Sequence, residues 1–188
     1  MLKELNLDDI ILLKAMSGWS KVNTRMLMSS VNFKRTKFYN CVNKLIRLGL
    51  INRVLTGEYE LTDKGRQLAE KIMDPSDASR ILNGEGEPLK LKINGSEIEV
   101  KNLNDFQSIL SEVESEDLYQ QVRSGSIARW LYAIGDKYLS REVNKLRTII
   151  TRSNVKEKLK AIIEERVKFL GELLAIASTP RRGRPSRQ

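Results

Sequence analysis

The sequence of 188 residues contains no histidine and a single cysteine, Cys41. One cysteine cannot form a disulfide within the chain, and a zinc site built from histidine and cysteine is excluded. Without histidine, catalysis would need a cluster of other reactive side chains, and none forms a recognisable motif. We therefore predict a protein that is not an enzyme and holds no metal. For Cys41 we expect a small, partly buried side chain, with a redox-sensing thiol as the alternative.

Long apolar runs and nucleotide-binding loops are also missing. No stretch approaches the ~20 apolar residues that a membrane helix needs, and Met1 to Ile10 mixes charged with apolar residues, unlike a signal peptide. The phosphate-binding patterns GxxxxGK[ST] and GxGxxG do not occur, which argues against nucleotide hydrolysis. We expect a cytoplasmic protein without a membrane segment and without a cofactor.

Positive charge is in excess and unevenly distributed. The formal net charge of +9 divides into +6 for residues 1–73, −3 for residues 74–150 and +6 for residues 151–188. Two basic ends around a mildly acidic middle favour a polyanion as the partner of the ends and another partner for the middle.

Residues 33–66 contain the most informative pattern. Phe33, Phe38, Val42 and Leu45 recur at steps of three to five, which predicts one buried stripe of a helix, and a hairpin around residues 56–58 follows. A helix with a basic, hydrogen-bonding face beside a hairpin suits the groove of a DNA duplex. The opposite face contains no acid, and with one arginine of the hairpin it provides the predicted DNA contacts: Lys34, Arg35, Thr36, Lys37, Tyr39, Asn40, Asn43, Lys44, Arg47 and Arg53.

This stretch resembles the winged-helix DNA-binding family, particularly the MarR- and PadR-like transcription regulators. The segments LIRLGLI at 45–51 and YELTDKG at 59–65 carry the resemblance, which covers about residues 5–73. It implies a recognition helix in the major groove and a β-hairpin wing at its side. Lys34 stands where a serine or threonine often caps that helix, and the wing is short. A winged helix that binds protein instead of DNA is the alternative.

A linker at residues 74–88 is expected to separate this head from a middle domain at 89–150. Alternation on both sides of the turn Asn94-Gly95 predicts a β-hairpin, followed by helices whose starts include a capping box of Asn104 with Gln107. Residues 118–131, with the turn Gly135-Asp136 and Leu139 after them, carry a loose resemblance to a small uncharacterised archaeal domain. The resemblance covers about residues 89–147 and implies no known chemistry. Trp130 is expected in the core of this domain. The middle domain as a whole is a candidate for binding a protein partner.

Residues 151–178 are predicted to contain one long amphipathic helix starting at Asn154. Its apolar stripe must be covered, either by the middle domain or by a second subunit, and we expect a homodimer. The stripe consists of Val155, Leu159, Ile163, Val167, Leu170, Leu174 and Ala177.

The last segment, residues 179–188, is predicted to be a disordered basic tail. Its centre matches the core of the AT-hook, a motif that lies in the minor groove of A·T-rich DNA, where narrow grooves attract arginine. A generic basic tail without sequence preference is the alternative. The predicted contacts are Arg181, Arg182, Gly183, Arg184 and Pro185.

Together these patterns predict a mainly α protein with small β-hairpins, of the α+β class. The expected function is that of a dimeric, nucleoid-associated transcription regulator that binds double-stranded DNA. Two alternatives remain open. One is an architectural chromatin or chromosome-segregation protein that bridges DNA, and the other is a DNA-anchored adaptor that recruits a protein through the middle domain.

Overall fold

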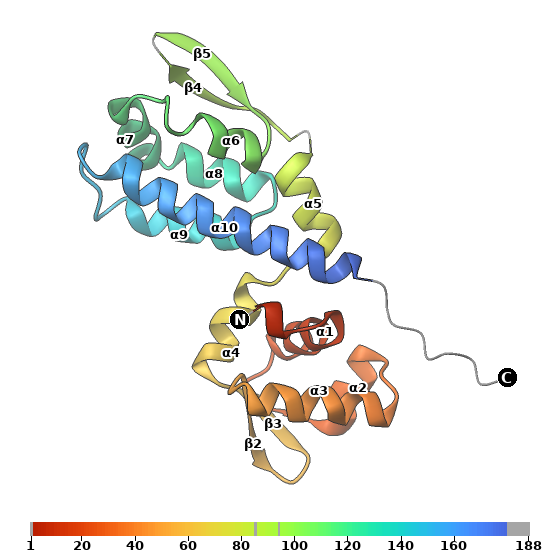
Figure 1. The fold of residues 1–188 in the computed structure, drawn as a ribbon. Helices are drawn as coiled ribbons and strands as arrows, with labels where there is room; N and C mark the ends of the chain where they lie inside the picture. The colour runs from red at the N-terminus through yellow and green to blue at the C-terminus, as the bar shows by residue number, and fades with distance from the viewer. Residues whose placement is uncertain (1, 85, 94, 180–188) are drawn as a thin grey trace, which may run out of the picture. The chain divides into compact units, whose positions relative to one another are not determined.

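The fold was analysed in a computed structural model that describes residues 2–84, 86–93 and 95–179. Its contacts divide the chain into two compact units. Unit 1 comprises Met1–Met73 with the end of the chain from Ala175, and unit 2 comprises Asp74–Leu174. Most of the chain is helical, with small antiparallel sheets, which confirms the predicted α+β class (Figure 1). No helix in the described part of the chain is long and apolar enough to cross a membrane.

Unit 1 combines helices with a three-stranded antiparallel sheet in the order β1-β3-β2. Strands β2 and β3 form a hairpin, and Val22 of β1 pairs with Tyr59 of β3. The elements are η1 (Leu2–Glu4), α1 (Leu7–Met16), β1 (Val22–Asn23), α2 (Thr24–Val31), α3 (Arg35–Arg47), β2 (Ile51–Leu55), β3 (Glu58–Leu61) and α4 (Asp63–Lys71).

Side-chain caps begin three of these helices. Asn6 and Asp9 form a capping box at α1, Asn23 caps α2, and Thr62 caps α4. Each cap satisfies backbone N–H groups that have no partner within the helix. Helix α3 differs, because its N-cap residue Lys34 makes no side-chain capping hydrogen bond.

The core of unit 1 lies between α1, α3 and the sheet. Phe38, Val42 and Leu45 of α3 are fully buried, as the predicted stripe requires, whereas Phe33 precedes the helix and is half-buried. Gly65 of α4 allows the closest approach, because a Cβ atom there would lie 1.9 Å from the carbonyl oxygen of Leu50. This packing fixes α3 in the unit and leaves its other face outside.

Unit 2 consists of a β-hairpin and helices. The hairpin pairs Leu89 with Val100 and Leu91 with Ile98, so the predicted hairpin is confirmed. Trp130 is buried, packs edge-on against Phe106 and donates a hydrogen bond to the Glu87 carbonyl oxygen. The elements are α5 (Pro75–Asn83), β4 (Leu89–Ile93), β5 (Ser96–Val100), α6 (Leu103–Ile109), α7 (Ser115–Ser124), α8 (Ser126–Ala133), α9 (Lys137–Leu146) and α10 (Val155–Ser178).

Two local expectations differ from the structure. The segment 74–88, expected to be a linker, contains helix α5, whose Ala78, Ile81 and Leu82 are buried. Pro75 at the first turn suits a helix start, because proline lacks only an N–H that is unpaired there anyway. Helix α6 is capped by Asn102, two residues before the predicted Asn104. Asn102 accepts a hydrogen bond from the backbone N–H of Asp105 and donates one from Nδ2 to the Asp105 carboxylate, so Asp105 takes the place predicted for Gln107.

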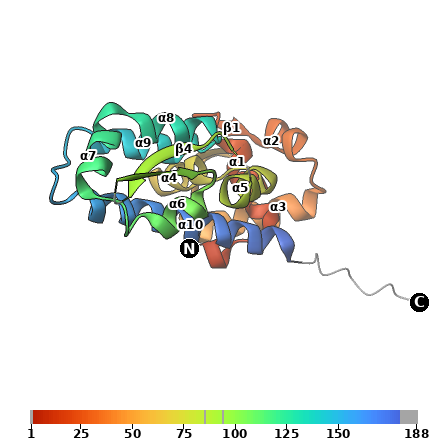
Figure 2. The same ribbon diagram turned by 90° about the horizontal axis from the view of Figure 1, so that it is seen from above.

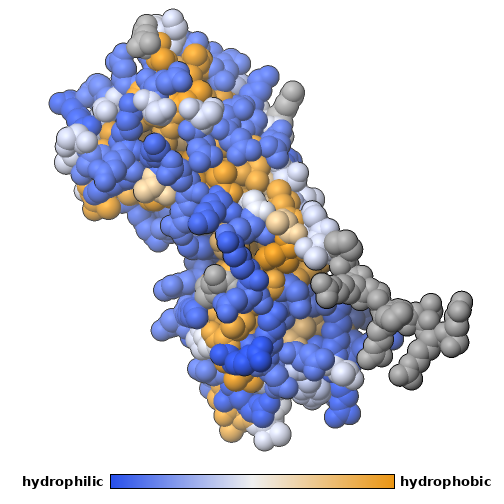
Figure 3. Space-filling view, viewed as in Figure 1, coloured by the Kyte–Doolittle hydropathy of each residue, from blue (hydrophilic) through white to orange (hydrophobic). Residues whose placement is uncertain are grey.

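Helix α10 packs within its own chain. The buried residues on its inner face agree with the predicted stripe at Val155, Leu159, Ile163 and Leu170. Arg166 and Leu173 are buried in place of the expected Val167 and Leu174. The buried positions therefore follow the 3.6-residue turn of the helix more closely than the expected spacing does. Figure 3 shows mostly hydrophilic side chains on the visible face of the molecule. The stripe therefore needs no second subunit, and this removes the observation on which the predicted dimer rested.

Candidate functional site

The outward face of α3 is the first candidate site. Thr36, Asn40, Asn43 and Arg47 follow one another at steps of four, three and four residues, and all are exposed. This spacing places them on one stripe of the helix. Every member can donate a hydrogen bond, and three of them can also accept one.

The first turn of α3 adds positive charge to this face. Lys34 and Arg35 are exposed, and the Arg35 guanidinium lies 5.9 Å from the ring centre of half-buried Tyr39. Because no side chain caps α3, its first N–H groups are available to an outside acceptor, and a helix N-terminus attracts anions. The structure thus brings Lys34, Arg35 and Tyr39 beside the polar stripe.

Two of the predicted contacts, Lys37 and Lys44, point elsewhere. The Lys44 Nζ atom lies 2.6 Å from Oδ2 of Asp9, and the Lys37 Nζ atom lies 2.7 Å from Oδ1 of Asp8. Both acids belong to α1. The charges of these two lysines are neutralised within unit 1, so the outward face carries fewer free cations than the sequence suggested.

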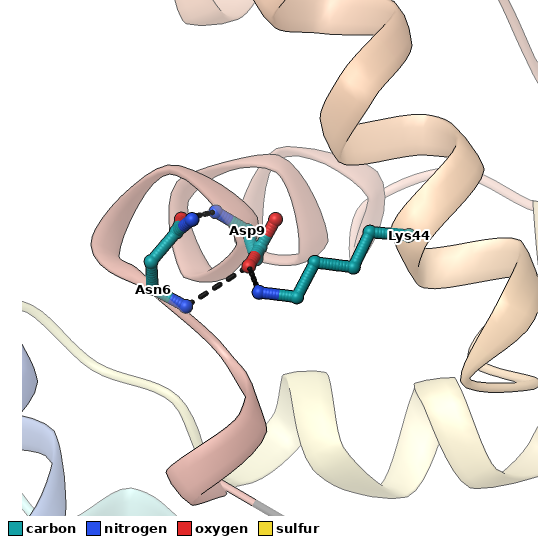
Figure 4. A network of polar contacts seen from close by, with 3 residues as sticks. All are labelled: Asn6, Asp9 and Lys44. Atoms are coloured by element: carbon teal, nitrogen blue, oxygen red, sulfur yellow. Dashed lines mark hydrogen bonds and ion pairs between the residues drawn. The ribbon is translucent and has the colours of Figure 1, made fainter.

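Asp9 is the centre of this internal network (Figure 4). Its side chain is fully buried and accepts hydrogen bonds from the Asn6 backbone N–H at 2.9 Å and from Lys44. In the view of Figure 4, Lys44 reaches from its helix to the start of α1, where Asn6 and Asp9 face each other. A buried carboxylate requires such partners, and one that loses its cation is strongly destabilising.

Cys41 lies next to this network on the inner side of α3. Burial raises its pKa to about 12, and the negative charge of Asp9 adds to the shift. A thiol with this pKa is protonated at neutral pH and reacts slowly, since the thiolate is the reactive form. The environment matches the expectation of a small buried side chain and offers no support for a redox sensor.

The β2–β3 hairpin is short, and its tip is hydrogen-bonded to the start of α2. At its tip, the carbonyl oxygen of Gly57 accepts hydrogen bonds from the backbone N–H of Thr24 at 2.8 Å and from its hydroxyl at 3.0 Å. Arg53 is exposed, with its guanidinium 5.9 Å from the ring centre of Tyr59. The pairing of β2 with β3 shifts between Arg53 and Leu55. Arg53 therefore stands on a short hairpin whose tip is hydrogen-bonded to Thr24.

The predicted contacts of the tail, Arg181, Arg182, Gly183, Arg184 and Pro185, lie outside the described residues. Within the described ranges, no three acidic or cysteine side chains come together in a group that could hold a metal ion.

Unit 2 contains a second candidate that the sequence analysis missed, an arginine-lined pocket at α7, α8 and α9. Arg129 and Arg147 line the pocket, and Arg123 lines an adjoining one. These residues are spread over 25 positions of the sequence without a motif, and only the packing of the three helices brings them together. The local sequence pattern held no signal for this site.

Comparisons of the chain with protein-family models, with curated proteins and with solved structures find no match. The functional inference therefore rests on the residues and their geometry.

Proposed function

We propose that unit 1 is a winged-helix domain that binds double-stranded DNA through the outward face of α3. The observation that carries the proposal is the exposed stripe of Thr36, Asn40, Asn43 and Arg47, which no acid interrupts. The major groove of B-DNA admits an α-helix, and asparagine and arginine match the hydrogen-bonding edges of adenine and guanine. The net charge of +6 on residues 1–73 supports a polyanionic partner.

The flanks of α3 supply contacts to the DNA backbone. Lys34 and Arg35 with the uncapped first turn hold one phosphate group, and Arg53 of the hairpin holds another. Because the hairpin tip is bound to Thr24, the wing rests against the backbone instead of inserting deeply into the minor groove. Lys37 and Lys44 act indirectly, by fixing α3 against α1.

The basic tail supplies a further contact in this proposal. Its sequence Arg182-Gly183-Arg184-Pro185 fits the minor groove of A·T-rich DNA, and the tether to unit 1 raises its effective concentration near the same duplex. The whole chain is then a nucleoid-associated transcription regulator that combines a base-reading helix with an A·T-directed tail.

A selection of bound duplexes from a random pool tests this proposal, followed by fluorescence anisotropy on the best duplex. Arg47→Ala should weaken binding by on the order of 1–3 kcal/mol if Arg47 reads a base. The matched control is Arg66→Ala, which removes an exposed arginine of α4 in the same unit and should change affinity little. Equal losses in both variants would show that only overall charge matters. Absence of binding to every duplex would favour a protein-binding winged helix.

The salt dependence separates the exposed cations from the neutralised ones. In a variant that lacks residues 179–188, the two phosphate contacts proposed for unit 1, one at Lys34 with Arg35 and one at Arg53, predict a slope of log K against log salt of about −2. Engagement of two more phosphates by Lys37 and Lys44 would steepen the slope to about −4. Removal of the tail should weaken binding to A·T-rich duplex more than to G·C-rich duplex, and equal losses would reduce the tail to a neutraliser of phosphates.

A further inference from the structure

The pocket at α7, α8 and α9 has the size of a small-molecule site. Its volume is about 520 Å³, and an adjoining pocket of about 410 Å³ shares Asn144 and Arg147 with it. Ligand sites in proteins commonly span roughly 300–1,000 Å³. Figure 1 and Figure 2 both show α7, α8 and α9 gathered on one side of unit 2.

Positive charge in this pocket is not neutralised by the protein. Arg129 and Arg147 line it, Arg123 lines its neighbour, and none of its lining residues is acidic. Within the parts of the chain that the structure describes, none of the three guanidinium groups forms an ion pair with a carboxylate. Arg129 and Arg147 line the same pocket with no acidic residue in its lining, so a bound anion would offset their repulsion.

Backbone and side-chain contacts hold two of these arginines in place. Arg147 donates from Nε to the Arg123 carbonyl oxygen at 3.1 Å and from Nη1 to Oδ1 of Asn144 at 3.1 Å. Arg123 in return donates from Nη1 to the carbonyl oxygen of Arg147 at 2.6 Å. The Nη2 group of Arg147 keeps no partner among the described residues, and a guanidinium with a free edge is well suited to a phosphate or carboxylate.

Gly125 lies beside the Arg147 guanidinium and is favoured there by its backbone conformation. A Cβ atom at this position would lie 3.4 Å from Nη1 of Arg147, and the backbone φ of +77° is one that other residues rarely adopt. Gly125 also precedes α8 as an N-cap residue without a side-chain capping bond. Hydroxyl groups stand beside it, with Ser124 Oγ 2.9 Å from Ser126 Oγ, and Arg129 donates to the latter at 3.3 Å.

An aromatic ring provides an apolar surface at the rim of the pocket. The Tyr132 side chain is 59% exposed and lines the pocket one helical turn after Arg129. The Lys137 ammonium lies 5.8 Å from its ring centre, which adds a further cation at this rim. A ligand with a charged group and an attached ring or chain would find complementary surfaces at the two ends.

We propose that this pocket binds the phosphate group of a phosphorylated small molecule, with Arg129 and Arg147 at the phosphate and Tyr132 against the attached group. A phosphate dianion matches several guanidinium N–H donors at once. A DNA backbone is the weaker candidate, because residues 74–174 contain 16 basic and 17 acidic residues, and a surface that tracks a duplex needs a basic excess. The proposal is independent of DNA binding by unit 1.

Isothermal titration of the full-length protein tests the pocket directly. The probes are inorganic phosphate, AMP and ribose 5-phosphate, with adenosine as the ligand that lacks phosphate. We expect saturable binding of at least one phosphate monoester, tighter than that of inorganic phosphate, and no binding of adenosine. The double variant Arg129→Gln with Arg147→Gln should weaken binding by at least about tenfold. The matched control Arg80→Gln removes an exposed arginine of α5 in the same unit, which pairs with Asp77, and should change binding by less than about twofold.

Three outcomes would overturn the proposal. The first is no saturable binding of any phosphorylated probe, and the second is unchanged binding in the double variant. The third is equal affinity for inorganic phosphate and both monoesters, which would leave a free-anion site only. Circular dichroism shows whether the double variant is folded, and Arg129→Gln alone, an exposed position, replaces it if Arg147 proves necessary for folding. A loss of duplex binding in these variants without any small-molecule binding would assign the arginines to DNA instead.

Discussion

Replacement of Arg166 by methionine should remove a large part of the folding stability of unit 2. The Arg166 guanidinium is 2% exposed and donates to fully buried Asp136, from Nε to Oδ2 at 2.7 Å and from Nη2 to Oδ1 at 3.0 Å. Asp136 also caps α9 by accepting the backbone N–H of Leu139 at 3.0 Å. In Arg166→Met the carboxylate stays buried with that single remaining donor.

The geometry sets the size of the effect. Two charge-assisted hydrogen bonds are lost at roughly 1.5–3 kcal/mol each, and removal of one partner of a buried ion pair typically costs about 3–5 kcal/mol. A unit of about 100 residues is stable by roughly 5–15 kcal/mol. We therefore expect Arg166→Met to reduce the free energy of unfolding of unit 2 by about 3–5 kcal/mol, which is a large part of a total of roughly 5–15 kcal/mol.

Tryptophan fluorescence during urea unfolding isolates unit 2 in the full chain. The protein has two tryptophans, Trp19 in unit 1 and Trp130 in unit 2, so Trp19→Phe leaves Trp130 as the only reporter. In that background, Asp136→Asn keeps an oxygen for the α9 cap but removes the charge. The variant that combines Arg166→Met with Asp136→Asn should lose only about 1–3 kcal/mol of the free energy of unfolding, because no unpaired charge remains buried.

Additivity would refute this reasoning. If the loss in the double variant equals the sum of the two single losses within about 0.5 kcal/mol, Arg166 and Asp136 are not coupled and their contact does not stabilise unit 2. A loss below about 1 kcal/mol in Arg166→Met alone would have the same meaning, since exposed ion pairs contribute that little.

Two further predictions concern unit 1. Lys44→Met should lower the free energy of unfolding of unit 1 by about 1–3 kcal/mol, because buried Asp9 loses its cation. Asn43→Ala on the exposed face should change that free energy by less than about 0.5 kcal/mol. Urea unfolding followed by Trp19 fluorescence measures both, and equal losses would contradict the inward role of Lys44. Cys41 should react slowly with a thiol reagent at pH 8 in the native protein and at once after unfolding in guanidinium. Its pKa is raised from 9.0 to about 12 in the folded state, so the unfolded chain ionises first and stability should fall as pH rises above 9; fast native labelling, or the same pH dependence in Cys41→Ala, would contradict the buried thiol.

The parts of the fold that the sequence predicted are those determined by neighbouring residues. The buried stripe of α3 joins Phe38, Val42 and Leu45, which stand three or four positions apart, and the 89–100 hairpin depends on alternation around a two-residue turn. Such interactions are visible in a short window of sequence. Helix α5 was missed because Pro75 and the glycines after Asn83 indicated a break in the helix. Between them, the apolar residues Ala78, Ile81 and Leu82 lie at helical spacing.

The parts that could not be predicted depend on contacts between distant segments. An apolar stripe on α10 shows that a face is buried but not which surface covers it, so the sequence left the middle domain and a second subunit both open. Arg166 lies inside that stripe, and its partner Asp136 is 30 residues away. The arginines of the unit 2 pocket, and the acids that neutralise Lys37 and Lys44, became visible only in the packed structure.

The two buried ion pairs share an arrangement that bears on the DNA-binding face. Asp9 and Asp136 each satisfy the start of a helix and each receive a cation from a helix far away in the sequence, Lys44 of α3 and Arg166 of α10. An apolar residue at either cationic position could pack against many surfaces, but a buried carboxylate is stable only where the cation of its partner helix reaches it. Each pair therefore favours one rotation of its helix, a role in specificity that buried ionic groups have in some proteins. For α3, rotation about the helix axis decides which side chains face outward. By holding Lys44 inside, Asp9 keeps Asn40, Asn43 and Arg47 on the exposed face, so the internal ion pair and the proposed recognition surface are two sides of the same helix orientation.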